Sequence, residues 1–267
     1  MNNTSIHTHS LPPRLESPSI TTWIIAIVFV ALFLNGFASA NITGDRLFNG
    51  ASNLGVFIGD AFPPNLNRVD VIAKAMLETF QMAIVGVVFG VILSLPMALL
   101  CANNTSPHPV IRFIAINLVS AFRTIPDLVW ALVFVIAVGL GPLAGILAIV
   151  MDTIGFCARF FAERIEEIDP GPSHALNAIG AKRSSVVLGA VIPECGPSFV
   201  ATSLFSVEKA VRSAVVLGLV GAGGIGVELS ASMNLFRYDQ ALTVIIAILV
   251  VVICVERVSG MIRKKIM

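Results

Sequence analysis

The chain has 267 residues, of which 56% are hydrophobic and only 12% are charged, and its mean hydropathy is +0.91. Soluble proteins carry about twice that share of charged residues, so this chain has too little polar surface to fold as a globule in water. The net charge of +1 gives no reason to expect nucleic acid as a partner. The composition instead predicts a protein whose solvent is membrane lipid.

Six apolar stretches are long enough to cross a bilayer, which takes about 20 mostly apolar residues. They are Thr21 to Ala40, Ala75 to Leu100, Phe113 to Val138, Leu143 to Phe161, Ser198 to Leu219 and Ala241 to Val258. Each is expected to be helical, because lipid offers the backbone no hydrogen bonds. A signal peptide cut near Ala40 is an alternative for the first stretch, but its long and weakly charged N-terminal flank favours a retained helix.

Charge placement predicts the orientation of the chain. If both termini are cytoplasmic, ten Lys and Arg residues lie inside and four lie outside, as the positive-inside rule requires. The resulting division is a cytoplasmic tail (1–20), a first transmembrane helix (21–40), an external segment (41–74), a five-helix core (75–258) and a cytoplasmic C-terminal tail (259–267). Cys101, Cys157, Cys195 and Cys254 have no paired spacing and are expected to pack as small apolar residues.

The polar segment 162–193 interrupts this apolar sequence and is predicted to lie in the cytoplasm. The Asp169-Pro170-Gly171-Pro172 run should end the preceding helix, and Ser173 is a suitable N-cap for a new one. That short helix would show an apolar face and end at Gly180. A second amphipathic helix should follow Lys182 and Arg183, with an apolar stripe formed by Val186, Val187, Ala190 and Val191.

This segment resembles the cytoplasmic coupling loop, or EAA motif, of ABC importer permeases, through Gly180-Ala181 and Ile192-Pro193 at the spacing of that family. The chain departs from the motif at His174, where the family has Glu, and at Leu176, where it has a small residue. The resemblance implies that an ATPase binds here, whereas a helix lying on the bilayer surface is the alternative. The ATPase-coupling residues it implies are His174, Ala175, Leu176, Gly180, Ala181, Lys182, Arg183 and Pro193.

The second half of the chain also resembles the phosphonate ABC transporter permeases. The motifs are Arg123-Thr-Ile-Pro126-Asp127, Val138 to Pro142, Glu166 to Pro172, Arg212-Ser-Ala and the glycine string Gly218 to Gly226, and the resemblance runs from about Phe62 to the C-terminus. It implies a type I importer of the bacterial inner membrane that carries phosphonate, phosphite or a related oxyanion by alternating access. The implied partners are a second permease copy, two ATPases that bind ATP and Mg, and an external substrate-binding protein. The permease itself would be non-catalytic and hold no cofactor.

Several charged residues fall within the apolar stretches, where each costs about 2.5 to 3.5 kcal/mol at a helix centre. Such residues should pair, face the interior or line a pathway. Glu208 and Arg212 are spaced to pair on one helix face, as are Arg123 and Asp127, while Lys209 has no partner on its own helix. The substrate-pathway candidates are therefore Arg123, Asp127, Asp152, Glu208, Lys209 and Arg212.

Three other interpretations are less well supported. The glycine string contains G-x-G-x-x-G at Gly221 to Gly226, but an apolar membrane helix precedes it where a dinucleotide site needs a strand. A membrane enzyme would need a gathered set of catalytic groups, and the four histidines lie in the tail and loops. A channel would not need the coupling loop. Within importers, a permease for another small solute such as methionine is the alternative.

Overall fold

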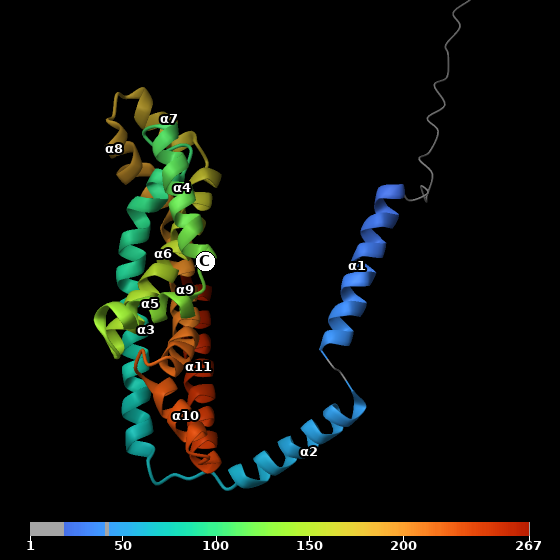
Figure 1. Cartoon of the computed structure of the whole chain (residues 1–267). Coiled ribbons are helices and arrows are strands. Elements are labelled where there is room, and N and C mark those ends of the chain that lie inside the picture. The colour runs from blue at the N-terminus through green and yellow to red at the C-terminus, as the bar shows by residue number, and fades with distance from the viewer. Residues whose placement is uncertain (1–18, 41–42, 267) are drawn as a thin grey trace, which may run out of the picture. The chain divides into compact units, whose positions relative to one another are not determined.

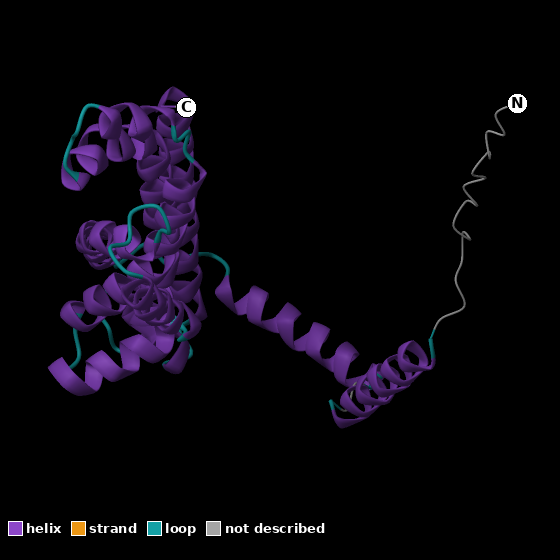
Figure 2. Cartoon of the chain, turned by 90° about the horizontal axis from the view of Figure 1, so that it is seen from above, coloured by secondary structure: helices purple, strands orange, loops and turns teal. Residues whose placement is uncertain are grey.

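The computed structural model describes residues 19–40 and 43–266, so most of the expected N-terminal tail lies outside the described residues. The described part is built from helices and contains no strand (Figure 2). The chain divides into two compact units, residues 1–58 and residues 59–267. The second unit is called the core.

The first unit contains α1 (Ile20–Ser39), a continuous apolar helix long enough to cross a membrane. The hydroxyl of Ser19 caps its start by accepting a hydrogen bond from the backbone N–H of Thr21, at 3.3 Å. A second helix, α2 (Gly44–Ala61), follows within the segment predicted to be external. The sequence analysis assigned no helix there.

Four long helices of the core are also apolar enough to cross a membrane (Figure 1). They are α3 (Val69–Cys101), α6 (Pro142–Glu167), α9 (Ile192–Leu219) and α11 (Tyr238–Ile266). The short elements α7 (Gly171–Ala178), α8 (Arg183–Val186) and the π-turn η1 (Val187–Val191) lie at one end of the core, and α10 (Ile225–Asn234) lies nearer the other. We refer to these as the α7 end and the α10 end.

The remaining predicted span, Phe113 to Val138, is not one straight helix. It is divided into α4 (Pro109–Thr124) and α5 (Asp127–Val138), whose axes differ by 90°. Pro126 lies at the break, where it holds the preceding residue out of helical conformation. The Trp130 ring closes the corner, since its edge meets Phe122 at 6.1 Å between ring centroids. Counted as one span, the pair completes a five-helix core, and α1 is the additional N-terminal helix.

The most extensive helix contact of the core is between α3 and α6, and two glycines permit their close approach. A Cβ atom on Gly86 would lie 2.6 Å from Ile149 Cγ2, and one on Gly90 would lie 2.5 Å from Thr153 Cβ. Ser94 is buried one turn further along α3 and donates a 2.6 Å hydrogen bond to the Gly90 carbonyl. Small residues of this kind let membrane helices approach closely, and here they set the spacing of the whole core.

We predict that Gly90→Ala destabilises the protein by about 1 to 3 kcal/mol, because the added methyl group must displace Thr153. Thermal unfolding of the detergent-purified protein would measure the effect. The matched control is Gly260→Ala in α11, where a Cβ atom would meet no neighbour within 4 Å. That change should leave the unfolding temperature unchanged or raise it, because alanine favours a helix over glycine. An equal response to both substitutions would contradict the close-packing argument.

Candidate functional site

The first part of the loop forms a helix, but it starts earlier than the sequence indicated. α7 begins at Gly171, directly after Pro170, and the side chain of this N-cap residue makes no capping hydrogen bond. The expected N-cap, Ser173, is therefore wrong: it lies inside the helix. Proline is well suited to the first turn because its missing N–H would have no partner there. Asp169 supports the start from outside, since its Oδ1 accepts a 3.0 Å hydrogen bond from the Gly171 N–H.

Gly180 ends α7 as expected. Its φ of +78° is in the left-handed region that favours glycine. Its N–H donates to the Asn177 carbonyl at 3.0 Å, and the Ala181 N–H donates to the Leu176 carbonyl at 3.1 Å. These two crossed bonds form a Schellman motif, which satisfies carbonyls left open at the helix end. The turn between α7 and α8 is thus fixed by backbone geometry.

The second part of the loop differs from the expected separate helix. α8, η1 and α9 follow one another without a break, so Arg183 to Leu219 forms one helical rod with a π-turn in it. Val186, Ala190 and Val191 of the predicted stripe are buried within this chain and pack toward its own core. Pro193 lies in the first turn of α9 and does not interrupt the rod. A movement of the loop would therefore be transmitted directly to the fifth span.

The loop is also tied to the connection between α3 and α4. The Arg183 guanidinium donates to the carbonyl of Ser106 in that connection. Glu166, near the end of α6, accepts hydrogen bonds from the Asn103 N–H at 2.6 Å and from Arg112 at 3.2 Å. The α7 end of the core is consequently a polar assembly that joins three separate parts of the chain.

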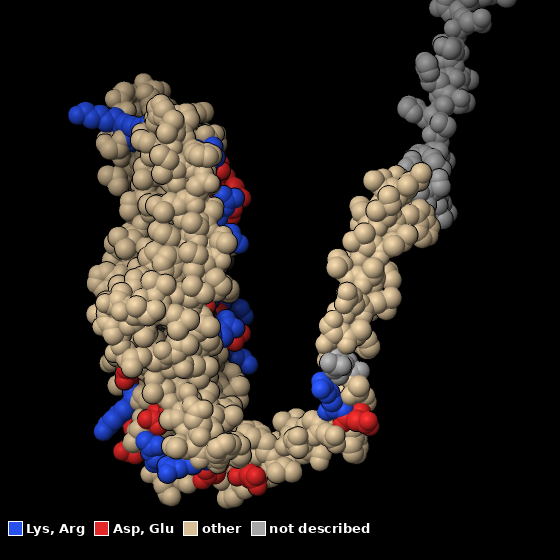
Figure 3. Space-filling model, in the orientation of Figure 1, with Lys and Arg blue, Asp and Glu red and all other residues tan. Residues whose placement is uncertain are grey.

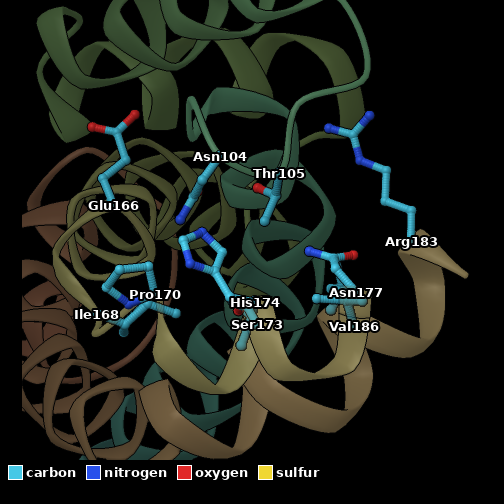
Figure 4. Close-up of a pocket in the computed structure, with 12 residues that line it drawn as sticks. Asn104, Thr105, Glu166, Ile168, Pro170, Ser173, His174, Asn177, Arg183 and Val186 are labelled. Carbon is cyan, nitrogen blue, oxygen red and sulfur yellow. The ribbon is translucent and has the colours of Figure 1, made fainter. Parts of the chain in front are cut away.

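A cavity of about 610 Å³ opens among these elements (Figure 4). His174 and Asn177 of α7 line one wall, and Asn104 and Thr105 of the α3–α4 connection lie across from them. Leu176 packs against η1, because its Cδ1 lies 3.5 Å from the position that a Cβ atom on Gly189 would occupy. The exposed apolar surface of this segment includes Ala175 and Ile179, and Ile179 is 79% exposed. Lys182 and Arg183 are exposed as well, while Ala181 is half-buried.

The charged residues within the spans form two cross-helix pairs. Lys209 of α9 lies 2.7 Å from Asp152 Oδ1 of α6, with its ammonium group 5.3 Å from the centre of the Phe156 ring. Glu208 accepts a 2.7 Å hydrogen bond from Arg263 of α11. The Glu208–Arg212 pairing expected from helical spacing is therefore wrong. Glu208 is buried, and its carboxylate is engaged by Arg263 of α11, a residue distant in sequence that packs beside α9.

Two arginines among the substrate-pathway candidates have no anionic partner within the described residues. Arg212 is exposed on α9, and Arg123 is exposed at the end of α4. The expected Arg123–Asp127 contact is not formed, because the 90° break lies between them. Asp127 instead accepts a 3.0 Å hydrogen bond from the Leu128 N–H at the start of α5, where the helix dipole favours a carboxylate.

Glu78 is a further carboxylate inside the predicted span Ala75 to Leu100, and it was not among the predicted site residues. Glu78 Oε1 accepts a 3.2 Å hydrogen bond from the Gly224 N–H, and Thr79 Oγ1 accepts one of 2.7 Å from the Ile225 N–H. These contacts hold the glycine string against α3 beside a cavity of about 390 Å³. The search for charges in apolar stretches that selected Asp152 would also have found Glu78.

In Figure 3 the charged side chains of the core gather at its α10 end and along one edge, and the broad surface turned to the viewer carries few. A helical core with several apolar spans and a polar loop at one end is typical of an integral membrane protein. The chain belongs to the family described as "Binding-protein-dependent transport system inner membrane component", whose model matches residues 90–267. It is therefore a non-catalytic, multi-span subunit of an ABC importer of the inner membrane.

Several of the relatives are permeases named for the transport of phosphorus oxyanions. It is 35% identical to the "Phosphite transport system permease protein PtxC" of Stutzerimonas stutzeri over 90% of this chain and 87% of that protein. It is 39% identical to the "Phosphate-import permease protein PhnE" of Mycolicibacterium smegmatis over 76% of this chain and 38% of that protein. A methionine transporter structure, "Inward facing conformations of the MetNI methionine ABC transporter", matches with a TM-score of 0.68 at 20% identity, covering 76% of this chain and 99% of that one. The structural likeness supports the fold.

We predict that Glu208→Gln lowers the stability of the protein by about 1 to 3 kcal/mol, because Arg263 then loses its carboxylate in a largely buried position. Arg212→Met should leave the unfolding temperature unchanged, since Arg212 has no carboxylate partner in the described chain. Combining Glu208→Gln with Arg263→Met should recover most of the loss. If Arg212→Met destabilised the protein as much as Glu208→Gln, the result would instead support the Glu208–Arg212 pair predicted from the sequence.

Proposed function

We propose that this chain is the transmembrane subunit of an ATP-driven importer for phosphite, phosphonate or a related phosphorus oxyanion. The observation that carries the proposal is the similarity to the phosphite permease over nearly the full length of both chains. The permeases named for phosphate import and for phosphonate transport are similar to the same region. The unpaired arginine on α9 supports an anionic substrate, because guanidinium groups bind phosphorus oxyanions strongly.

The coupling mechanism follows from the loop geometry. A cytoplasmic ATPase would bind the exposed face of α7, centred on Ala175 and Ile179 and flanked by Lys182 and Arg183. A short helix with a small apolar face fits a groove in a partner. Since the loop continues into α9 as one rod, closure of the ATPases on ATP and Mg would tilt the fifth span and alternate the access of the pathway. His174 lines the cavity and is itself exposed, so it would shape the loop and remain accessible to the ATPase.

The complex would contain two copies of this permease, two ATPase subunits and an external binding protein that delivers the anion. Both termini and the α7 end would face the cytoplasm, which agrees with the distribution of Lys and Arg along the sequence. The α10 end would then face outward and receive the binding protein.

A methionine importer is the alternative within the same fold. The chain is 30% identical to the "Methionine import system permease protein MetP" of Bacillus subtilis, over 40% of this chain and 51% of that protein. This similarity covers less of the chain at lower identity than the similarity to the phosphite permease. Transport assays with both classes of solute would separate the two functions.

We predict that the reconstituted complex hydrolyses ATP faster when the binding protein loaded with phosphite or a phosphonate is added. Proteoliposomes should accumulate the same anion only when ATP is supplied on the ATPase side. Stimulation by methionine and not by any phosphorus oxyanion would contradict the proposed substrate.

We further predict that Gly180→Pro and Ala175→Asp uncouple transport. Proline cannot take the left-handed conformation of residue 180, and an aspartate would place a charge in the apolar face of α7. Both variants should insert into the membrane but fail to co-purify with the ATPase. Asn234→Asp on α10 is the matched control for an added charge on an exposed helix, and it should retain the ATPase. Normal co-purification and uptake by both loop variants would exclude this loop as the ATPase docking site.

A further inference from the structure

One side of the core carries charged side chains that are exposed within the membrane-spanning helices. We call it the α6–α9 face and define it by Asp152 and Phe156 of α6 and Phe205, Lys209 and Arg212 of α9. On α9 these positions are spaced by three or four residues, so they share one side of the helix. Val216 continues the same stripe one turn further and is exposed. The opposite side of α9, which includes Ala210 and Ala214, is buried in the core.

Lipid is a poor partner for this face. Lys209 lies ten residues before the end of α9 at Leu219, or about 15 Å along the helix, and Arg212 lies about 10 Å from that end. The Lys209 side chain does not reach toward the membrane surface, since Asp152 holds its ammonium group at 2.7 Å. Charged residues at such depth face other protein or a polar cavity. The charges of the α6–α9 face therefore call for protein or a polar pathway beside them in place of lipid.

A single chain also leaves the electrostatics of the face incomplete. The side chains of Lys209 and Asp152 are 37% and 20% exposed, and they neutralise each other. Arg212 adds one uncompensated positive charge to each chain. Two copies related by a two-fold axis, with these faces opposed, would bring two such charges together. A phosphorus oxyanion has several negatively charged oxygens, so it can bind both guanidinium groups at once.

We propose that the α6–α9 faces of two permease copies meet across a two-fold axis and form one composite anion site, in which Arg212 of each copy binds the same phosphorus oxyanion. This inference rests on the proposed function and specifies its binding site. Each guanidinium offers parallel N–H donors that match two oxygens of the anion. Lys209 flanks the site, and its ion pair with Asp152 neutralises most of the positive charge of Lys209. This neutralisation keeps the affinity for the anion low enough for release to the cytoplasm, as transport requires.

Cysteine cross-linking tests the geometry without reference to the substrate. Val216→Cys would place a thiol on the α6–α9 face, and Val88→Cys would place one at a similarly exposed position of α3. Both changes are made with Cys254→Ser, which removes the exposed native cysteine. We expect a short bifunctional thiol reagent to join two copies through position 216 but not through position 88. Joining through position 88 alone would overturn the proposed interface.

Uptake assays test the shared role of Arg212. Complexes carrying two different affinity tags allow purification of permease pairs with Arg212→Met in neither, one or both copies. We expect phosphite uptake to fall roughly tenfold or more when both copies are changed, and to take an intermediate value when one is changed. ATP hydrolysis stimulated by the loaded binding protein should persist in all three. Arg212→Lys should recover part of the uptake, because the charge remains while the paired donors are lost.

Asp152→Asn gives a second, opposite signature. Releasing Lys209 should tighten anion binding and lower the KM for phosphite, whereas a purely structural ion pair would change stability and leave the KM unaltered. Unchanged uptake with Arg212→Met in both copies, beside active wild-type complex, would overturn the composite site alone. Absence of phosphorus oxyanion uptake by the wild-type complex would instead contradict the proposed function, and the cross-linking result would still report on the interface.

Discussion

The contact between α3 and α6 is the constraint on which the rest of the core depends. Gly86 and Gly90 allow these two helices to approach until Ile149 and Thr153 occupy the space of the missing side chains. In lipid, apolar surface alone gives helices little reason to associate, so close van der Waals contact of this kind has to supply the attraction. With α3 and α6 fixed, α9 packs against both of them, and α4 and α5 bend around α6.

Charge then decides how the remaining helices are oriented. Asp152 attracts Lys209 between α6 and α9, and Glu208 attracts Arg263 between α9 and α11. Each pair removes a charge that lipid would not tolerate, and together they orient α9 about its axis. The consequence is that Arg212 is directed outward on an exposed stripe, where no carboxylate of the described chain meets it. The same ion pairs that stabilise the core thus leave one cation available for an anionic cargo.

The continuous rod from α8 through η1 to α9 connects the two functional regions. At one end of the rod, α7 presents a small apolar surface next to a turn fixed by Gly180. Lys209 and Arg212 lie roughly three-quarters of the way along the rod. A stiff helix moves as a unit, so a displacement of the loop would also change the position of these cations. Coupling and substrate contact are in this way parts of one mechanical element, and the π-turn is the place where the rod can adjust.

The sequence by itself determined the solvent of this protein, the number of spans and the position of the loop, because these depend on local composition and on proline and glycine. It also indicated the end of α7, since a left-handed residue at position 180 follows from short-range geometry. It could not assign the partner of Glu208: Arg212 is near in sequence, but Arg263 on another helix is near in space. Nor could it show that the third span is bent by 90°, or that the second loop helix is continuous with α9. Those features depend on which faces of distant helices meet, and only the tertiary structure decided them, because packing and charge pairing between helices override the preferences of neighbouring residues.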